Sequence, residues 1–163
     1  MNVLTTSLPV SARFLRTLAA TLFLGSVMLT GTTALAQDKI GTVTTSQGNV
    51  SLLRAGNSLP APTGTEVKAT DTLRTGEAAN VSVAFADGTR VLLGPNSNLS
   101  MEAYAYNPDS KKGNMTFNFA KGTMRMITGA ITKNNPDAAV LKTPSATAGI
   151  RGTDFIVDVP ASQ

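Results

Sequence analysis

The sequence contains no cysteine, no histidine and no tryptophan. Without cysteine the chain has no thiol nucleophile and no disulfide, and without histidine it lacks the commonest general base and metal ligand. Charged residues make up only 15% of the chain, against about 25% in an average soluble domain. These absences exclude most familiar enzyme mechanisms, and the low charge argues against a disordered chain or a coiled coil.

The first 36 residues have the layout of a secretory signal peptide. Two arginines precede an uncharged apolar run at residues 17–30, and a small-x-small cleavage site follows at residues 34–36. An uncleaved anchor is the weaker alternative, because a helix needs about 20 apolar residues to span a bilayer. We therefore predict cleavage after Ala36, a single domain at residues 37–163, and a periplasmic or secreted location.

The charge distribution gives no indication of nucleic-acid binding. The formal net charge of the whole chain is +4, and loss of the two signal-peptide arginines reduces it to +2. Apart from Lys111 and Lys112, the remaining positive residues are scattered singly along the chain. Because binding to nucleic acid needs a basic patch or stripe, we expect no nucleic-acid partner.

Apolar and polar residues alternate with a period of two along the whole mature chain, and no long segment has helical spacing. Examples are the runs at 81–85, 115–119 and 155–159, each bounded by residues typical of turns. The sequence predicts a compact, antiparallel all-β domain, a sandwich or roll of roughly 9 to 11 short strands. We expect its first hairpin to pair residues 43–45 with residues 50–52.

The turn at residues 86–88 allows two hairpin registers. A two-residue loop of Asp87 and Gly88 would divide the apolar residues between both faces of the hairpin. A three-residue loop places Val83 opposite Val91 and collects the apolar residues on one face. We predict the second register, because a half-buried sheet fixes register by its apolar face. Gly88 then takes a left-handed conformation, and Asp87 is a turn residue.

Several motifs follow one another along the chain in a characteristic order. They are Gly41-Thr42-Val43, Gly48-x-Val50, Asp71-x-Leu73-x-Thr75-Gly76, Val83-x-Phe85-x-Asp87-Gly88-Thr89, Leu93-x-Pro95-Asn96-Ser97-x-Leu99, Lys121-Gly122-Thr123-Met124-Arg125 and the string TPSATAGIRGTDF at residues 143–155. In this order they resemble a FecR-type periplasmic domain, the module of sensor proteins that relay the occupancy of an outer-membrane receptor to a sigma factor. The final string is the most specific, and the resemblance covers residues 41–159.

The resemblance implies a part in envelope signalling through protein binding, with one difference from the sensors. The sensors of this kind have three parts: a cytoplasmic anti-sigma segment, one membrane helix and a periplasmic region that contains this domain. Here the cytoplasmic segment is absent and the N-terminus has the pattern of a signal peptide, so we expect a stand-alone module that does not signal across the inner membrane by itself. The family member is either minimal or truncated after Gln163, and in a truncated chain residues 155–159 would form an exposed edge.

We expect no enzyme activity, no catalytic residue, no cofactor and no metal site. The carboxylates show no recognisable catalytic spacing, and no serine has a histidine partner. Asp154 and Asp158 share one face of a strand, which allows a calcium pair, but a solvated face is the simpler interpretation. Met115, Met124 and Met126 could hold copper(I), yet their strand spacing favours packing in the core.

Arg151, Gly152 and Thr153 form a candidate partner or structural site. An arginine carries five donors in a rigid plane that suits a carboxylate of a partner or ligand. We favour the structural role, in which Arg151 pairs with Asp71 or Asp87 of the same chain and Gly152 supplies a turn.

The expected partner is another envelope protein, bound through a loop end or a sheet edge. The alternative is a glycan-associated module for peptidoglycan or surface polysaccharide, based on analogy with related domains. Tyr104 and Tyr106 lie on one face of their segment and could stack on sugar rings, although a cross-strand aromatic pair in the core also explains them.

Overall fold

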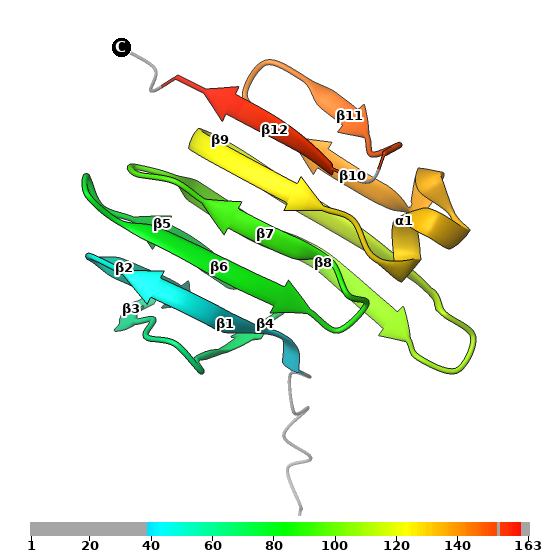
Figure 1. The fold of residues 1–163 in the computed structure, drawn as a ribbon, viewed down its shortest axis with the longest axis horizontal. Helices are drawn as coiled ribbons and strands as arrows, with labels where there is room; N and C mark the ends of the chain where they lie inside the picture. Colours follow the sequence, from blue (N-terminus) through cyan, green and yellow to red (C-terminus); the bar gives the residue numbers. More distant parts are fainter. Residues whose placement is uncertain (1–38, 153, 161–163) are drawn as a thin grey trace, which may run out of the picture. The chain divides into compact units, whose positions relative to one another are not determined.

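The computed structural model describes residues 39–152 and 154–160, so the expected signal peptide at residues 1–36 lies outside the described residues. The described part is built from twelve β-strands, a short α-helix and one turn of 3₁₀ helix (Figure 1). In chain order these are β1 (Lys39–Gln47), β2 (Val50–Arg54), β3 (Asn57–Pro60), β4 (Glu66–Lys68), β5 (Thr72–Thr75), β6 (Asn80–Phe85), β7 (Arg90–Leu93), β8 (Asn98–Asn107), β9 (Lys112–Ile127), α1 (Ala130–Asn134), η1 (Pro136–Ala138), β10 (Ala139–Lys142), β11 (Thr147–Gly149) and β12 (Asp154–Val159).

The predicted all-β class is confirmed. The described residues form twelve strands, more than the expected 9 to 11. The sequence did not indicate β4 and β11, which have three residues each. A strand of that length is too short to show alternation in the sequence.

The strands form one curled sheet in the order β3-β2-β5-β8-β9-β7-β6-β1-β4. β9 is the long strand that belongs to both layers of this sheet. Its first half pairs with β8 and β10, and its second half pairs with β7 and β12. Within the described residues every strand pair is antiparallel except β10 with β9. The predicted antiparallel sandwich or roll is therefore a sheet that folds over on itself.

The hydrophobic core lies between the two layers. Phe85 on β6 and Phe117 on the first half of β9 come from opposite layers, and their ring centroids are 5.1 Å apart. The three methionines Met115, Met124 and Met126 are fully buried, as their strand spacing predicts. Thioethers enclosed by apolar side chains act as packing groups.

β9 changes the phase of its alternation where it passes from one layer to the other. Odd-numbered residues up to Phe119 point into the core, whereas the even-numbered Met124 and Met126 do so afterwards. Gly122 lies at this change with a φ of +100°. A Cβ on Gly122 would lie 2.5 Å from Cα of Ser97, so only glycine fits this crossing without displacement.

The hairpin of β6 and β7 has the predicted three-residue loop. Val83 lies opposite Val91, and the amide of Phe85 donates to the carbonyl of Thr89 over 2.8 Å. Gly88 has a φ of +87°, which is the left-handed conformation that the register requires. The apolar face of the hairpin is therefore buried as a unit.

The predicted first hairpin is wrong. β1 pairs with β6 and β4, whereas β2 pairs with β5 and β3. Val43 on β1 and Val50 and Leu52 on β2 are all buried, but they enter the core from opposite layers. Alternation records only that a residue points inward, so two strands that face each other across a core have the same pattern as two paired strands.

Candidate interaction surface

Arg151 lies at the surface between β11 and β12. Its Nη2 atom is 2.8 Å from Oδ1 of Asp137, and both side chains are exposed. The predicted pairing of Arg151 with Asp71 or Asp87 is wrong, because both of these carboxylates are buried beside other donors. The guanidinium is thus held only by an exposed ion pair, and its role as a partner site stays a prediction.

The two residues that follow Arg151 add little to this site. The carbonyl of Gly152 accepts a hydrogen bond of 2.6 Å from Oγ1 of Thr128, which fastens the segment to the end of β9. Thr153 lies outside the described residues.

Replacing Arg151 with alanine is expected to leave the melting temperature almost unchanged. Exposed ion pairs contribute little because water and salt screen them. Thermal denaturation of Arg151→Ala beside Asp137→Asn measures this directly. A marked fall in melting temperature for Arg151→Ala alone would contradict the surface position and support the structural role.

Asp71 is instead held by Arg54, a pairing that the sequence did not reveal. Nε of Arg54 donates to Oδ1 over 2.9 Å and Nη2 donates to Oδ2 over 2.7 Å. The amide of Lys68 donates to the same carboxylate over 2.7 Å. Hydrogen bonding to Asp71 raises the pKa of Arg54. The group joins β2 to the turn between β4 and β5, so its role is architectural.

Asp87 is the centre of a second buried network. Its carboxylate accepts from the amide and hydroxyl of Thr89 at 3.1 and 2.7 Å and from the hydroxyl of Tyr104 at 3.0 Å. The hydroxyl of Thr89 in turn accepts from the amide of Gly129 at 3.0 Å. Asp87 is therefore a turn residue, as predicted, and it also connects the β6–β7 loop to β8 and to the start of α1.

Tyr104 and Tyr106, the candidate sugar-stacking residues, are both half-buried against the core. The ring of Tyr104 stacks on Phe85 with centroids 5.7 Å apart. Its hydroxyl is bonded to Asp87, so this side chain already has partners within the fold. The stacking role of the two tyrosines stays a prediction.

The ionisation of Tyr104 should be displaced to high pH. Burial of the phenol and the nearby carboxylate of Asp87 both raise the pKa of Tyr104 above its usual value of 10.0. The folded state therefore favours the neutral phenol, whereas the unfolded chain ionises near pH 10.0. The stability of the fold is unaffected by Tyr104 ionisation below pH 10.0 and declines as the pH rises further.

The variant Tyr106→Phe tests this displacement, because Tyr104 is then the remaining tyrosine of the two in the sequence. We expect no phenolate absorbance near pH 10 while circular dichroism still reports a folded protein. Titration of the folded variant with a midpoint at 10.0, the usual value, would contradict the buried hydrogen bond.

The solvent side of β7, β9 and β12 carries an unusual set of side chains. In one row across these strands Arg90 lies beside Ile127, and Ile127 lies beside Asp154. In the next row Leu92 lies beside Arg125, which lies beside Ile156. We call these six residues the outer face: Arg90, Leu92, Arg125, Ile127, Asp154 and Ile156.

Exposed apolar side chains are concentrated on the outer face. Leu92, Ile127 and Ile156 are 41%, 39% and 68% exposed, and Leu59 on β3 is the only other exposed large apolar residue in the described part of the chain. β12 pairs only with β9 among the described strands, so the outer face extends to an open edge. Exposed large apolar side chains gathered on neighbouring strands make this face a candidate interaction site.

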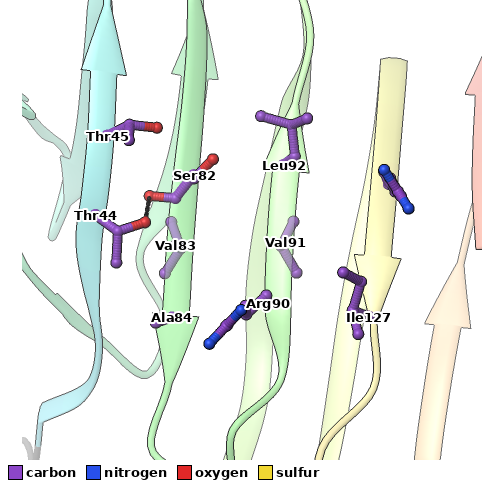
Figure 2. Close-up of a pocket in the computed structure, with 10 residues that line it drawn as sticks. Thr44, Thr45, Ser82, Val83, Ala84, Arg90, Val91, Leu92 and Ile127 are labelled. Carbon is purple, nitrogen blue, oxygen red and sulfur yellow. Dashed lines mark hydrogen bonds between the residues drawn. The ribbon is translucent and has the colours of Figure 1, made fainter. Parts of the chain in front are cut away.

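A hollow of ≈ 440 Å³ adjoins the outer face on the side of β1 and β6. Figure 2 shows Arg90, Leu92 and Ile127 at this hollow, with Thr44 and Ser82 across from them. The hydroxyl of Thr44 donates to the carbonyl of Ser82 over 3.2 Å. The hollow is therefore lined by apolar groups, hydroxyls and the side chains of Arg90 and Arg125.

The sequence contains one indication of the outer face, which the sequence analysis did not single out. Leu92 and Ile156 are apolar residues at positions where the alternation of their strands calls for polar ones. An apolar side chain at a solvent position is unremarkable by itself. Only the strand order brings β7, β9 and β12 together and makes the two residues part of one surface.

Neither a cluster of typical metal-ligating side chains nor a membrane-spanning helix is found among the described residues. No group of three or more acidic, histidine or cysteine side chains is placed to hold a metal ion in this part of the chain. Asp154, one of the two carboxylates considered for calcium, is held through both oxygens by Arg125 at 3.0 and 2.6 Å. None of the described helices is long and apolar enough to cross a membrane.

The structure is a mostly antiparallel β-domain whose distinctive feature is the group of exposed apolar side chains on the outer face. Residues 71–163, more than half of the chain, match the model of the family described as FecR protein. The chain therefore belongs to the FecR family. Comparison with curated proteins and with solved structures gives no match.

The matched region contains the string at residues 143–155 and the strands β7, β9 and β12 of the outer face. The resemblance that the sequence motifs indicate begins earlier, at Gly41. Membership of the family indicates a role in envelope signalling. Proteins of this family are associated with the membrane and have a periplasmic domain.

Proposed function

We propose that this chain is a non-catalytic, exported FecR-type module that binds another protein of the cell envelope through the outer face. The observation that carries the proposal is the concentration of Leu92, Ile127 and Ile156 on three neighbouring strands. Exposed apolar groups on a surface lower the free energy when a partner removes them from water.

The composition of the outer face favours a protein over a lipid surface. Arg90, Arg125 and Asp154 alternate with the apolar residues in both rows. Hydrocarbon chains would leave the guanidinium of Arg90 without a hydrogen-bond partner and would remove water from the Arg125–Asp154 ion pair, and both effects are costly. A protein surface supplies polar groups between apolar ones, as the fully buried parts of protein interfaces do.

The absence of catalysis is also proposed from four of the described carboxylates, whose oxygens already have side-chain partners. Asp71 and Asp154 are held by arginines, Glu102 by Lys142, and Asp87 by Tyr104 and Thr89. A general acid or base must instead reach a substrate proton in an open site.

Export predicts a defined N-terminus. The protein recovered from cells should begin at Gln37 and lie in the periplasmic or secreted fraction, because the cleavage pattern ends at Ala36. N-terminal sequencing of the purified protein measures this. Recovery of a chain that starts at Met1 from the membrane fraction would contradict the exported state.

Chemical crosslinking in intact cells tests the binding role. We expect the wild-type chain to be recovered with a reproducible envelope partner, and the double variant Leu92→Ser/Ile127→Ser to lose most of that product. Leu59→Ser is the matched control, because Leu59 is 43% exposed on β3, away from the outer face. Melting curves verify that all variants are folded.

The proposal fails if no partner is recovered with the wild-type chain. It also fails if the control variant loses as much product as the double variant, since the apolar residues of the outer face would then have no special role.

A further inference from the structure

The guanidinium of Arg90 on the outer face has no partner in the described part of the chain. The guanidinium groups of Arg54, Arg125 and Arg151 each bind a carboxylate. The side chain of Arg90 makes no hydrogen bond or ion pair with any residue that the structure describes. It is exposed, and it lies at the hollow shown in Figure 2.

The surroundings of Arg90 explain why no carboxylate among the described residues reaches it. Its neighbours across the strands are Ala84 on β6 and Ile127 on β9, neither of which has a polar side chain. Asp154 lies one strand further on, and Arg125 holds both of its oxygens. Counted over its six residues, the outer face therefore has one positive charge in excess, carried by Arg90; the exposed Asp158 lies further along β12, opposite Thr123.

The same surroundings define the chemistry of a complementary ligand. A guanidinium presents several N–H donors in one plane and binds a carboxylate through two parallel hydrogen bonds. Apolar side chains on both sides of that carboxylate would contact Leu92 and Ile127, which are partly exposed next to Arg90. An acidic side chain between aliphatic ones meets both requirements.

We propose that Arg90 binds the carboxylate of an acidic, aliphatic-flanked segment of the envelope protein that docks on the outer face. This inference rests on the proposed function, because it specifies the partner chemistry of the same surface. The charge complementarity of Arg90 selects this occupant over a second copy of the chain, whose identical outer face would bring another excess positive charge.

The variants Arg90→Gln and Arg74→Gln form a matched pair for the test. The side chain of Arg74 on β5 is also exposed and also makes no ion pair or hydrogen bond among the described residues, so both variants lose one free positive charge. We expect Arg90→Gln to reduce the yield of the envelope crosslink by about tenfold, the lower range for a lost charge-assisted hydrogen bond. Arg74→Gln should leave it unchanged.

A peptide probe tests the carboxylate directly on the purified chain. The probe is acetyl-Gly-Val-Asp-Leu-Glu-Val-Gly-amide, and its control has asparagine and glutamine in place of the two acids. We expect the acidic peptide to shift the amide resonances of residues 90–92 and 127, and the control peptide to leave them in place. Arg90→Gln should abolish the shifts, whereas Arg74→Gln should retain them.

The outcomes separate this inference from the proposed function. A crosslink that is lost in Leu92→Ser/Ile127→Ser but kept in Arg90→Gln would overturn the role of Arg90 and leave the binding surface in place. If no envelope partner is recovered at all, the peptide titration still decides the inference, and absence of shifts with the acidic peptide overturns it. Shifts caused by an oligogalacturonate and not by the peptide would overturn it in favour of a glycan carboxylate.

Discussion

Replacing Arg54 with alanine is expected to lower the free energy of unfolding by about 3 kcal/mol. The variant removes both donors that Arg54 gives to Asp71 and leaves a carboxylate that is only 1% exposed. A buried charge without its partner costs more than the ion pair contributed. The value lies at the lower end of the usual range because Arg54 itself is 28% exposed.

Urea denaturation at neutral pH measures this loss, with Arg74→Ala as the control. Arg74 lies on β5 in the same layer but is exposed and unpaired within the described residues, so its removal should change stability by less than about 0.5 kcal/mol. The double variant Arg54→Met/Asp71→Leu should recover part of the loss, because it removes the buried charge as well. Equal midpoints for Arg54→Ala and Arg74→Ala would contradict a buried ion pair.

The second large effect is expected at Gly122, where β9 crosses between the layers. Alanine there combines about 1–3 kcal/mol of backbone strain with the displacement of Ser97, which costs about 1–3 kcal/mol in a packed interior. The residue has a φ of +100°, and its added Cβ would lie 2.5 Å from Cα of Ser97. Because β9 pairs with β7, β8, β10 and β12, a shift at this point disturbs both layers.

Gly149→Ala is the control for Gly122→Ala. No atom lies within 4 Å of a Cβ added at Gly149, and its φ is not positive. Thermal unfolding should therefore separate the two variants by several degrees. If both melt at the same temperature, β9 does not cross between the layers at Gly122.

The parts of the fold that could be predicted are those that local patterns determine. The register of β6 and β7 follows from the alternation of apolar residues and from Gly88, because both act within a few residues of the turn. The burial of Met124 and Met126 follows from the same alternation. Each of these properties depends on the strand itself.

The parts that could not be predicted depend on which strands lie side by side. The pairing of Arg54 with Asp71 requires β2 to lie beside β5, and alternation carries no information about lateral order. The failed hairpin of β1 and β2 has the same origin. The outer face also needs the order β7-β9-β12, since Leu92 and Ile156 become neighbours of Arg125 only in that arrangement.

Photocrosslinking at single sites is the most direct test that the outer face binds an envelope protein. A benzophenone amino acid would replace Leu92, Ile127 or Ile156 in turn, and Leu59 as the control, in the cells that produce the protein. We expect irradiation to give the same protein adduct from the three positions of the outer face and none from position 59. Adducts from position 59 alone, or no adduct from any of the three, would contradict the binding surface.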